Sequence, residues 1–170
     1  SGIRGVARKY DLKVVEDAAQ ALGSRNMYGY LGTQSDVGCF SLSVTKIIST
    51  GQGGFVVTRN EELGNKLRAI RTHGVEDVID PGKWGVAGFN FRITDIQAAI
   101  GLAQLQNIGE RIAKIKDIYS MYISGLGGCP NMKPIPVSLE TGEVPIYNEF
   151  LCNTRGDLIE KMKRCDMRHL

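Results

Sequence analysis

The first half of the chain alternates short apolar runs with stretches that are apolar on one side only. Apolar residues recur at helical spacing over residues 3–10, which predicts a short helix. A β-branched run predicts a buried strand at residues 13–16, and two further apolar runs predict strands at residues 37–43 and 54–58. The glycines of residues 51–54 supply the tight turn that joins the last two strands.

Capping residues mark the helices that follow. Asn60 is a good N-cap, and Gly74 ends the helix that Asn60 opens. Thr94 and Gln97 form a capping box, which predicts the start of a second helix. Gly109 is expected to break this helix before a third one begins, because glycine is a poor helix former.

A glycine-rich boundary separates the last part of the chain. Residues 125–130 end in a proline and predict a break between two units. Beyond them, residues 144–152 indicate a strand, and Thr154 is a suitable N-cap for a helix that runs to about Cys165. The order of strands and helices indicates the α/β class. Because the chain starts and ends in the middle of this pattern, we expect it to be an internal piece of a longer protein.

Composition and charge exclude several classes of protein. The chain is 42% apolar and 23% charged, which is typical of a globular protein. The net charge of +3 comes from scattered lysines and arginines and provides no basic stripe for nucleic acid. The apolar runs are too short to cross a bilayer. The cysteines lack metal-ligand spacing, so we expect free thiols in a reducing compartment, the cytoplasm: Cys39, Cys129, Cys152 and Cys165.

Two residues carry the most informative chemistry. Lys46 follows an apolar run and lies in a segment rich in serine, threonine and glycine, and Asp17 ends a β-branched run. Taken alone, Asp17 could be a turn residue and Lys46 a solvated surface lysine. Taken together, they are the two groups that pyridoxal phosphate (PLP) most needs: an amine for a Schiff base and a carboxylate for the pyridinium nitrogen. The pair therefore points to that cofactor.

Three further features have ordinary explanations beside the functional ones. The glycines of residues 51–54 lack the spacing of a phosphate-binding loop, so they indicate a turn that passes close to Lys46. His73 fits a loop or core histidine better than a catalyst. Arg92 could bind a substrate carboxylate or phosphate, but it could equally cap a helix or pair with Asp95.

The sequence resembles the DegT/DnrJ/EryC1/StrS aminotransferases over about residues 13–126, in order and at the family's spacing. The motifs that carry the resemblance are EDAAQA at residues 16–21, GCFS at residues 38–41 followed by Thr45 and Lys46, TGQGG at residues 50–54, His73 with Gly74, GFNFRITDIQAAIG at residues 88–101, and Gln104 with Leu105. Beyond Gly125 the similarity is loose.

The resemblance implies the fold type I arrangement of PLP-dependent transferases. Residues 1–106 would form the C-terminal part of the large PLP-binding domain, residues 107–128 a linking helix, and residues 129–170 the truncated start of a small C-terminal domain. Enzymes of this family transfer an amino group, usually from glutamate, to a keto group of a nucleotide-linked sugar. They work as homodimers whose active sites lie between the subunits.

The resemblance also implies a role for each matched residue. Lys46 is similar to the Schiff-base lysine, and Asp17 to the carboxylate at the ring nitrogen. Ser41 matches a serine that binds the cofactor phosphate, and Gln20 a residue near the phenolic oxygen. Asn90 matches a residue that reaches the cofactor phosphate of the neighbouring subunit. No metal is implied.

Other functions stay open at this point. Relatives with histidine in place of the lysine dehydrate sugars with pyridoxamine phosphate as cofactor. Lys46 therefore favours transamination over such a dehydration. Amination of a cyclitol, or a cofactor-free regulatory or interaction role, are further alternatives, and the last has no need of both Lys46 and Asp17. The family also uses phosphate-binding and ring-stacking groups that have no counterpart here, so we expect the isolated chain to be inactive.

Overall fold

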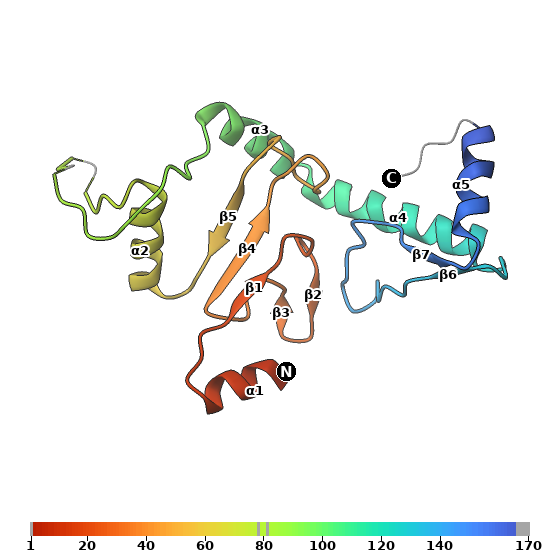
Figure 1. Ribbon diagram of the computed structural model, residues 1–170, viewed down its shortest axis with the longest axis horizontal. Helices are drawn as coiled ribbons and strands as arrows, with labels where there is room; N and C mark the ends of the chain where they lie inside the picture. Colours follow the sequence, from red (N-terminus) through yellow and green to blue (C-terminus); the bar gives the residue numbers. More distant parts are fainter. Residues whose placement is uncertain (1, 78, 81, 166–170) are drawn as a thin grey trace.

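A mixed three-stranded sheet lies at the centre of the protein (Figure 1). The computed structural model describes residues 2–77, 79–80 and 82–165. Strand β4 (Val37–Ser41) is the middle strand, parallel to β1 (Val15–Asp17) and antiparallel to β5 (Gly54–Val57). The sheet has helices beside it, so the α/β class predicted from the sequence is confirmed.

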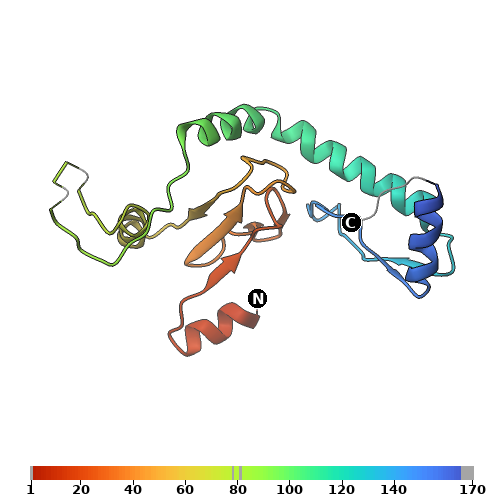
Figure 2. The ribbon, with the colours of Figure 1, turned by 45° about the horizontal axis from the view of Figure 1, so that its top comes forward.

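The described residues form five helices. They are α1 (Gly2–Lys9), α2 (Glu61–Arg71), α3 (Asp95–Leu105), α4 (Ile108–Leu126) and α5 (Arg155–Arg164). Figure 2 shows α3 and α4 following one another past one end of the sheet towards the C-terminal part. None of the helices in the described ranges has the length and apolar character that crossing a membrane requires.

Two of the predicted helix starts are confirmed by their capping bonds. Asn60 accepts a hydrogen bond from the backbone N–H of Leu63 at 2.8 Å. Thr94 and Gln97 form both bonds of the capping box. Thr154 precedes α5 as expected, although its side chain makes no capping bond.

Two successive helices separated by a break are present as predicted, but the predicted position of the break at Gly109 is wrong. The chain leaves the helical path at residues 106–107, and Gly109 lies inside the first turn of α4. A glycine lowers the stability of a helix by about 1 kcal/mol. This is too little to end a helix whose side chains pack against the rest of the protein. Tyr119, which is buried further along α4, shows that this helix does pack.

The predicted buried strand at residues 13–16 is only partly correct. The strand exists as β1, but the side chain of Val15 is 64% exposed. In the sheet that the structure describes, β1 is an edge strand with β4 as its neighbour. The β-branched pattern therefore identified the strand but not how far it is covered.

The strand predicted at residues 144–152 is much shorter in the structure. Only β7 (Phe150–Cys152) is a strand, and it pairs with β6 (Met132–Pro134), which the sequence did not indicate. Val144 instead donates its backbone N–H to the side chain of Ser24, so the first part of the segment is tied to another region.

The structure contains a further hairpin that the pattern missed. Strands β2 (Arg25–Asn26) and β3 (Gly29–Tyr30) pair in antiparallel fashion. Each has only two residues, and their side chains are exposed. Such short strands carry no apolar alternation from which they could be predicted.

The sheet and the loop after β4 share a small apolar core. Phe40 stacks on Phe55 across β4 and β5, with ring centroids 4.7 Å apart. The other buried apolar side chains of this region are those of Ala18, Val37, Leu42, Ile47 and Ile48. All four cysteines are free, as expected.

Helices α3 and α4 hold the segment that contains Lys46, which we call the lysine loop (residues 43–53). Gln104 of α3 binds Ser49 twice, because its amide nitrogen donates to the Ser49 carbonyl and its Oε1 accepts the Ser49 N–H. Gln97 donates to the carbonyl of Gln52 at 3.1 Å. Arg111 of α4 donates to the carbonyl of Ile47 at 3.3 Å. Two helices from later in the sequence thus fix the loop between β4 and β5.

A close backbone contact sets the turn before β4. Gly38 lies against Gly32, and a Cβ atom on Gly38 would overlap the carbonyl group of Gly32. Glu16 of β1 binds the same turn, since its carboxylate accepts the N–H groups of Gly32 at 2.6 Å and Gln34 at 2.8 Å. The turn at residues 32–34 is therefore packed closely against the sheet.

We expect Gly38→Ala to lower the free energy of unfolding by about 1–3 kcal/mol, because the added methyl group forces the backbone at Gly32 to move. Urea unfolding followed by circular dichroism measures the change. Gly109→Ala is the matched control: its new Cβ meets open space in a helix, so stability should rise by about 0.5–1 kcal/mol. Equal stability of the Gly38 variant and the wild type would contradict the close contact.

We expect Gln104→Met to release Ser49, because methionine keeps the length of the side chain but makes neither hydrogen bond. The loss of two bonds should lower the free energy of unfolding by about 1–2 kcal/mol and speed hydrogen exchange at the Ser49 amide. Exchange measured by mass spectrometry on peptides of the lysine loop tests this. Gln106→Met, at an exposed position just after α3, should leave the exchange unchanged.

Candidate active site

Two predicted site residues lie at the carboxyl ends of neighbouring parallel strands. Asp17 is the last residue of β1 and stands opposite Cys39 of β4. Ser41 is the last residue of β4. The N–H of Ala18 donates to the carbonyl of Cys39 at 2.8 Å, so the pairing continues past Asp17. In sheets of this kind, ligands bind outside the carboxyl ends of the parallel strands.

The carboxylate of Asp17 is exposed and makes a local hydrogen bond. Its Oδ1 accepts the backbone N–H of Ala19 at 3.1 Å. This is the turn geometry that the sequence left open for Asp17. The bond occupies one carboxylate oxygen, so the turn does not prevent the other oxygen from binding a donor. Gln20 follows in the same turn and is also exposed.

The lysine loop begins two residues after Ser41, the end of β4. The Ser41 hydroxyl donates to the hydroxyl of Ser43 at 3.2 Å and accepts the Ser43 N–H at the same distance. The N–H of Lys46 then donates to the Ser43 carbonyl at 3.0 Å, which closes a turn. Lys46 is half-buried, and Ile47 and Ile48 after it are buried. The apolar pair anchors the loop and leaves the lysine at its surface.

The glycines after Lys46 form a turn, as the sequence indicates. Gly51 and Gly53 have φ values of 81° and 128°, which side-chain-bearing residues rarely adopt. Leu42 donates its N–H to the carbonyl of Gly53 at 2.9 Å and accepts the N–H of Thr50 at 2.9 Å. The loop is thus closed at its base, where the chain enters β5.

Lys46 meets an aromatic residue that the sequence did not indicate. The Nζ atom of Lys46 lies 5.9 Å from the ring centroid of Tyr147. The hydroxyls of Tyr147 and Thr45 are 3.0 Å apart and hydrogen-bonded. Tyr147 lies 102 residues after Thr45 and beyond the matched motifs, so no local spacing could identify it.

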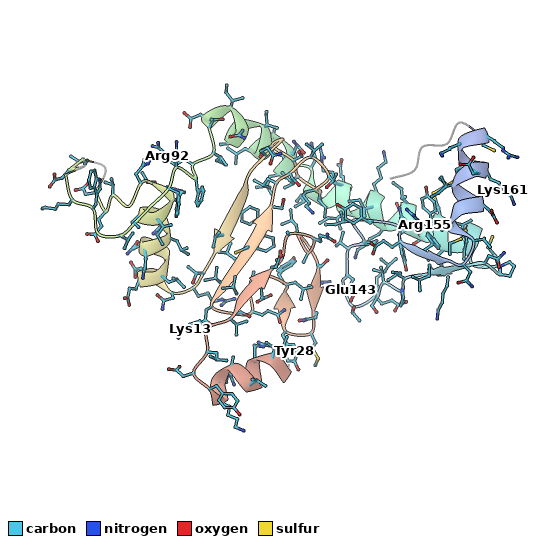
Figure 3. All side chains as sticks on the ribbon, viewed as in Figure 1. Lys13, Tyr28, Arg92, Glu143, Arg155 and Lys161 are labelled. Atoms are coloured by element: carbon cyan, nitrogen blue, oxygen red, sulfur yellow. The ribbon has the colours of Figure 1, made fainter. Side chains whose placement is uncertain are left out.

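Asn90 has its contacts elsewhere, at the end of α2. It forms a β-bridge with Thr72, and its Oδ1 accepts a hydrogen bond from Nε of Arg92 at 3.1 Å. An Arg92 nitrogen is also 3.5 Å from Nε2 of His73. Figure 3 shows Arg92 beside α2, away from the strand ends that carry Asp17 and Ser41. Within the described residues, the structure therefore places Asp17 and Ser41 at neighbouring strand ends, Gln20 in the turn after Asp17 and Lys46 in the loop after Ser41. Asn90 lies in a second cluster, with Arg92 and His73.

The chain is similar to known proteins over almost its whole length. The profile of the DegT/DnrJ/EryC1/StrS aminotransferase family matches residues 1–169. GDP-perosamine synthase of Caulobacter vibrioides is 35% identical over 166 residues, covering 92% of this chain and 44% of that protein. A UDP-4-amino-4,6-dideoxy-N-acetyl-beta-L-altrosamine transaminase of Campylobacter jejuni is 33% identical over 127 residues, covering 71% of this chain and 32% of that protein.

Solved structures share the fold. The crystal structure of DesV of S. venezuelae in complex with a ketimine intermediate superposes with a TM-score of 0.88 at 28% identity, covering 98% of this chain and 44% of that one. Escherichia coli GDP-4-keto-6-deoxy-D-mannose-3-dehydratase with bound hydrated PLP gives a TM-score of 0.82 at 23% identity, covering 98% and 48%. These matches confirm the expected fold type I arrangement of PLP-dependent transferases.

The chain spans less than half of the length of the relatives described above. The family profile nevertheless extends over all but the last residue of the chain. The chain therefore belongs to the DegT/DnrJ/EryC1/StrS aminotransferase family.

Proposed function

We propose that the full-length protein is a PLP-dependent aminotransferase that moves an amino group, from glutamate, to a keto group of a nucleotide-linked sugar. The observation that carries the proposal is the arrangement of Asp17 and Ser41 at adjacent carboxyl ends of parallel strands, with Lys46 in the loop that follows Ser41. The relatives named as a perosamine synthase and an altrosamine transaminase support the class of substrate.

The chemistry of these groups fits PLP. The cofactor has an aldehyde, a ring nitrogen and a phosphate, and the site offers an amine, a carboxylate and a hydroxyl for them. When bound, PLP supplies an electron-withdrawing ring that stabilises negative charge on the neighbouring substrate carbon. A lysine in a half-buried loop is accessible to the cofactor and yet held by its neighbours.

Each residue would contribute one physical task. Lys46 would attach the cofactor covalently through Nζ and, once released, would carry a proton to and from the reacting carbon. Asp17 would keep the ring nitrogen protonated, because a nearby negative charge favours the protonated form. Ser41 would donate its hydroxyl to the phosphate, and Gln20 would lie near the phenolic oxygen.

Lysine at position 46 favours transamination over the dehydratase alternative. The dehydratase among the solved structures is 23% identical, a likeness that concerns the fold alone. An amine at position 46 can both anchor the cofactor and accept a proton, which is what amino-group transfer requires.

We further propose that the full-length protein is a homodimer and that Asn90 serves the cofactor site of the partner. Asn90 is exposed, and its bonds hold it at the end of α2 rather than beside Lys46. A two-fold dimer would bring the Asn90 cluster of each chain to the strand ends of the other.

The covalent anchor can be mapped directly. Borohydride reduction of the full-length, PLP-loaded protein should leave a pyridoxyl group on Lys46, which peptide mass spectrometry locates. Lys46→Arg should abolish the label and the absorbance of bound cofactor, because a guanidinium does not form the covalent link. Lys66→Arg, at an exposed position of α2, is the matched control and should keep both. A label on a different lysine would refute the assignment.

Mixing two inactive variants tests the shared site. Full-length Lys46→Ala and Asn90→Ala proteins should each have little activity. If Asn90 acts across the dimer, a reassociated mixed dimer has one doubly damaged site and one intact site, so activity returns. With random mixing in equal amounts, about a quarter of all sites become intact. If mixed dimers form and activity stays absent, Asn90 acts within its own chain or not at all.

A further inference from the structure

One segment of the C-terminal part reaches back to the lysine loop, and we call it the crossing segment (residues 137–147). Its start is fixed by Tyr119 of α4, whose side chain is buried. The Tyr119 hydroxyl donates to the carbonyl of Ile135 at 3.2 Å and accepts the N–H of Val137 at 3.0 Å. The start of the crossing segment is therefore held against α4 at a defined point.

The middle of the crossing segment is tied to the turn before β2. Arg25 donates its N–H to the carbonyl of Gly142 at 3.0 Å. Val144 donates its N–H to Oγ of Ser24 at 3.0 Å, and both residues are buried. A buried hydrogen bond of this kind is costly to break, because each group would lose its partner without gaining water. The contact holds the segment against the region that follows β1.

The end of the crossing segment places Tyr147 beside the lysine. Its hydroxyl is bonded to Thr45 at 3.0 Å, and its ring centroid lies 5.9 Å from Nζ of Lys46. The bond to Thr45 fixes the edge of the ring, and the bond between Val144 and Ser24 fixes the backbone three residues earlier. Tyr147 is therefore held at its hydroxyl and through the backbone three residues earlier, with its ring next to the Lys46 amine.

We propose that Tyr147 is a positioning residue for Lys46. An aromatic ring attracts an ammonium group electrostatically and attracts an uncharged nitrogen much less. Tyr147 thus holds the Lys46 ammonium group through its ring, whose centroid lies 5.9 Å from Nζ. The catalytic part of this inference rests on the proposed function, because in that reaction Lys46 becomes a free amine only after its covalent bond to the cofactor is broken.

The position of Tyr147 also links two parts of the protein. The ring comes from the unit that follows residues 125–130, whereas Lys46 follows the central sheet. A displacement of the crossing segment would therefore alter the surroundings of the lysine. The crossing segment thus connects the C-terminal part to the lysine loop through the bond between Tyr147 and Thr45.

Acylation of Lys46 in the cofactor-free, full-length protein tests the contact without reference to activity. Acetic anhydride reacts only with an uncharged amine, so a limiting amount labels each lysine at a rate set by its uncharged fraction. Mass spectrometry gives the rate at Lys46 relative to Lys66. We expect Tyr147→Leu to speed labelling of Lys46 about two- to five-fold, because the cation loses the ring. Tyr147→Phe keeps the ring and loses only the Thr45 bond, so its labelling should stay closer to that of the wild type.

Tyr122→Leu is the matched control, since it removes a tyrosine of the same part of the chain that contacts Phe150 instead of Lys46. It should leave the labelling of Lys46 unchanged. Equal labelling in the wild type and Tyr147→Leu would overturn the proposal, as would an equal rise in Tyr122→Leu, which indicates general loosening. Labelling of Tyr147→Phe as fast as that of Tyr147→Leu would also overturn the proposal, because the phenylalanine ring still faces the lysine.

Kinetics of the loaded enzyme separate the two proposals. Tyr147→Leu should lower kcat about two- to five-fold and leave KM for the sugar unchanged, and Tyr147→Phe should restore most of the loss. An unchanged kcat together with a pyridoxyl label on Lys46 would overturn the role of Tyr147 and leave the proposed function standing. A pyridoxyl label on another lysine would overturn the assignment of Lys46 as the cofactor anchor, and with it the catalytic role of Tyr147, whatever the acylation rates show.

Discussion

The parallel pairing of β1 with β4 is the constraint on which the site depends. It fixes Asp17 opposite Cys39, so the chain leaves both strands at the same edge of the sheet. A shift of register by one residue would turn every side chain of β1 to the other face. Glu16 opposes such a shift, because its carboxylate already binds the N–H groups of Gly32 and Gln34 in the turn that leads to β4. The Glu16 carboxylate thus fixes both the register of β1 against β4 and the path of the chain into β4.

The lysine loop is ordered by contacts from distant parts of the sequence. Ordering one residue costs about 1–2 kcal/mol of backbone entropy, whereas one hydrogen bond contributes about 1 kcal/mol. A loop of this length therefore needs partners along much of its course. Gln97 and Gln104 bind one arm, Arg111 binds its middle, and Tyr147 binds Thr45 on the other arm. The position of the lysine is consequently a property of the assembled domain.

Features that depend on local physics could be predicted from the sequence. The caps at Asn60 and Thr94 were predictable because a cap needs only residues within one helical turn. The places of Asp17 at a strand end and of Lys46 in the loop after β4 were predictable from the neighbouring residues, and their roles toward the cofactor stay a prediction. The break near Gly109 was misplaced, since packing of α4 outweighs the propensity of one residue.

Features that depend on long-range contacts could not be predicted. The exposure of Val15 reflects which strands and helices cover β1, and the residues of β1 do not encode this. Tyr147 reaches Thr45 across 102 residues, by way of a segment that was predicted as a strand. The sequence contained a tyrosine there but no pattern to relate it to the lysine.

The surroundings of Asn90 give the dimer proposal its physical basis. Phe89 and Phe91 flank Asn90 and stack on each other with centroids 4.9 Å apart, yet they are 56% and 66% exposed. On α3, which follows them, Ile96 and Leu102 are 75% and 64% exposed. Exposed apolar side chains favour contact with another protein surface, because water solvates them poorly. Asn90 lies between these two exposed aromatic residues in the sequence, so an interface formed by this surface would bring Asn90 close to the partner chain.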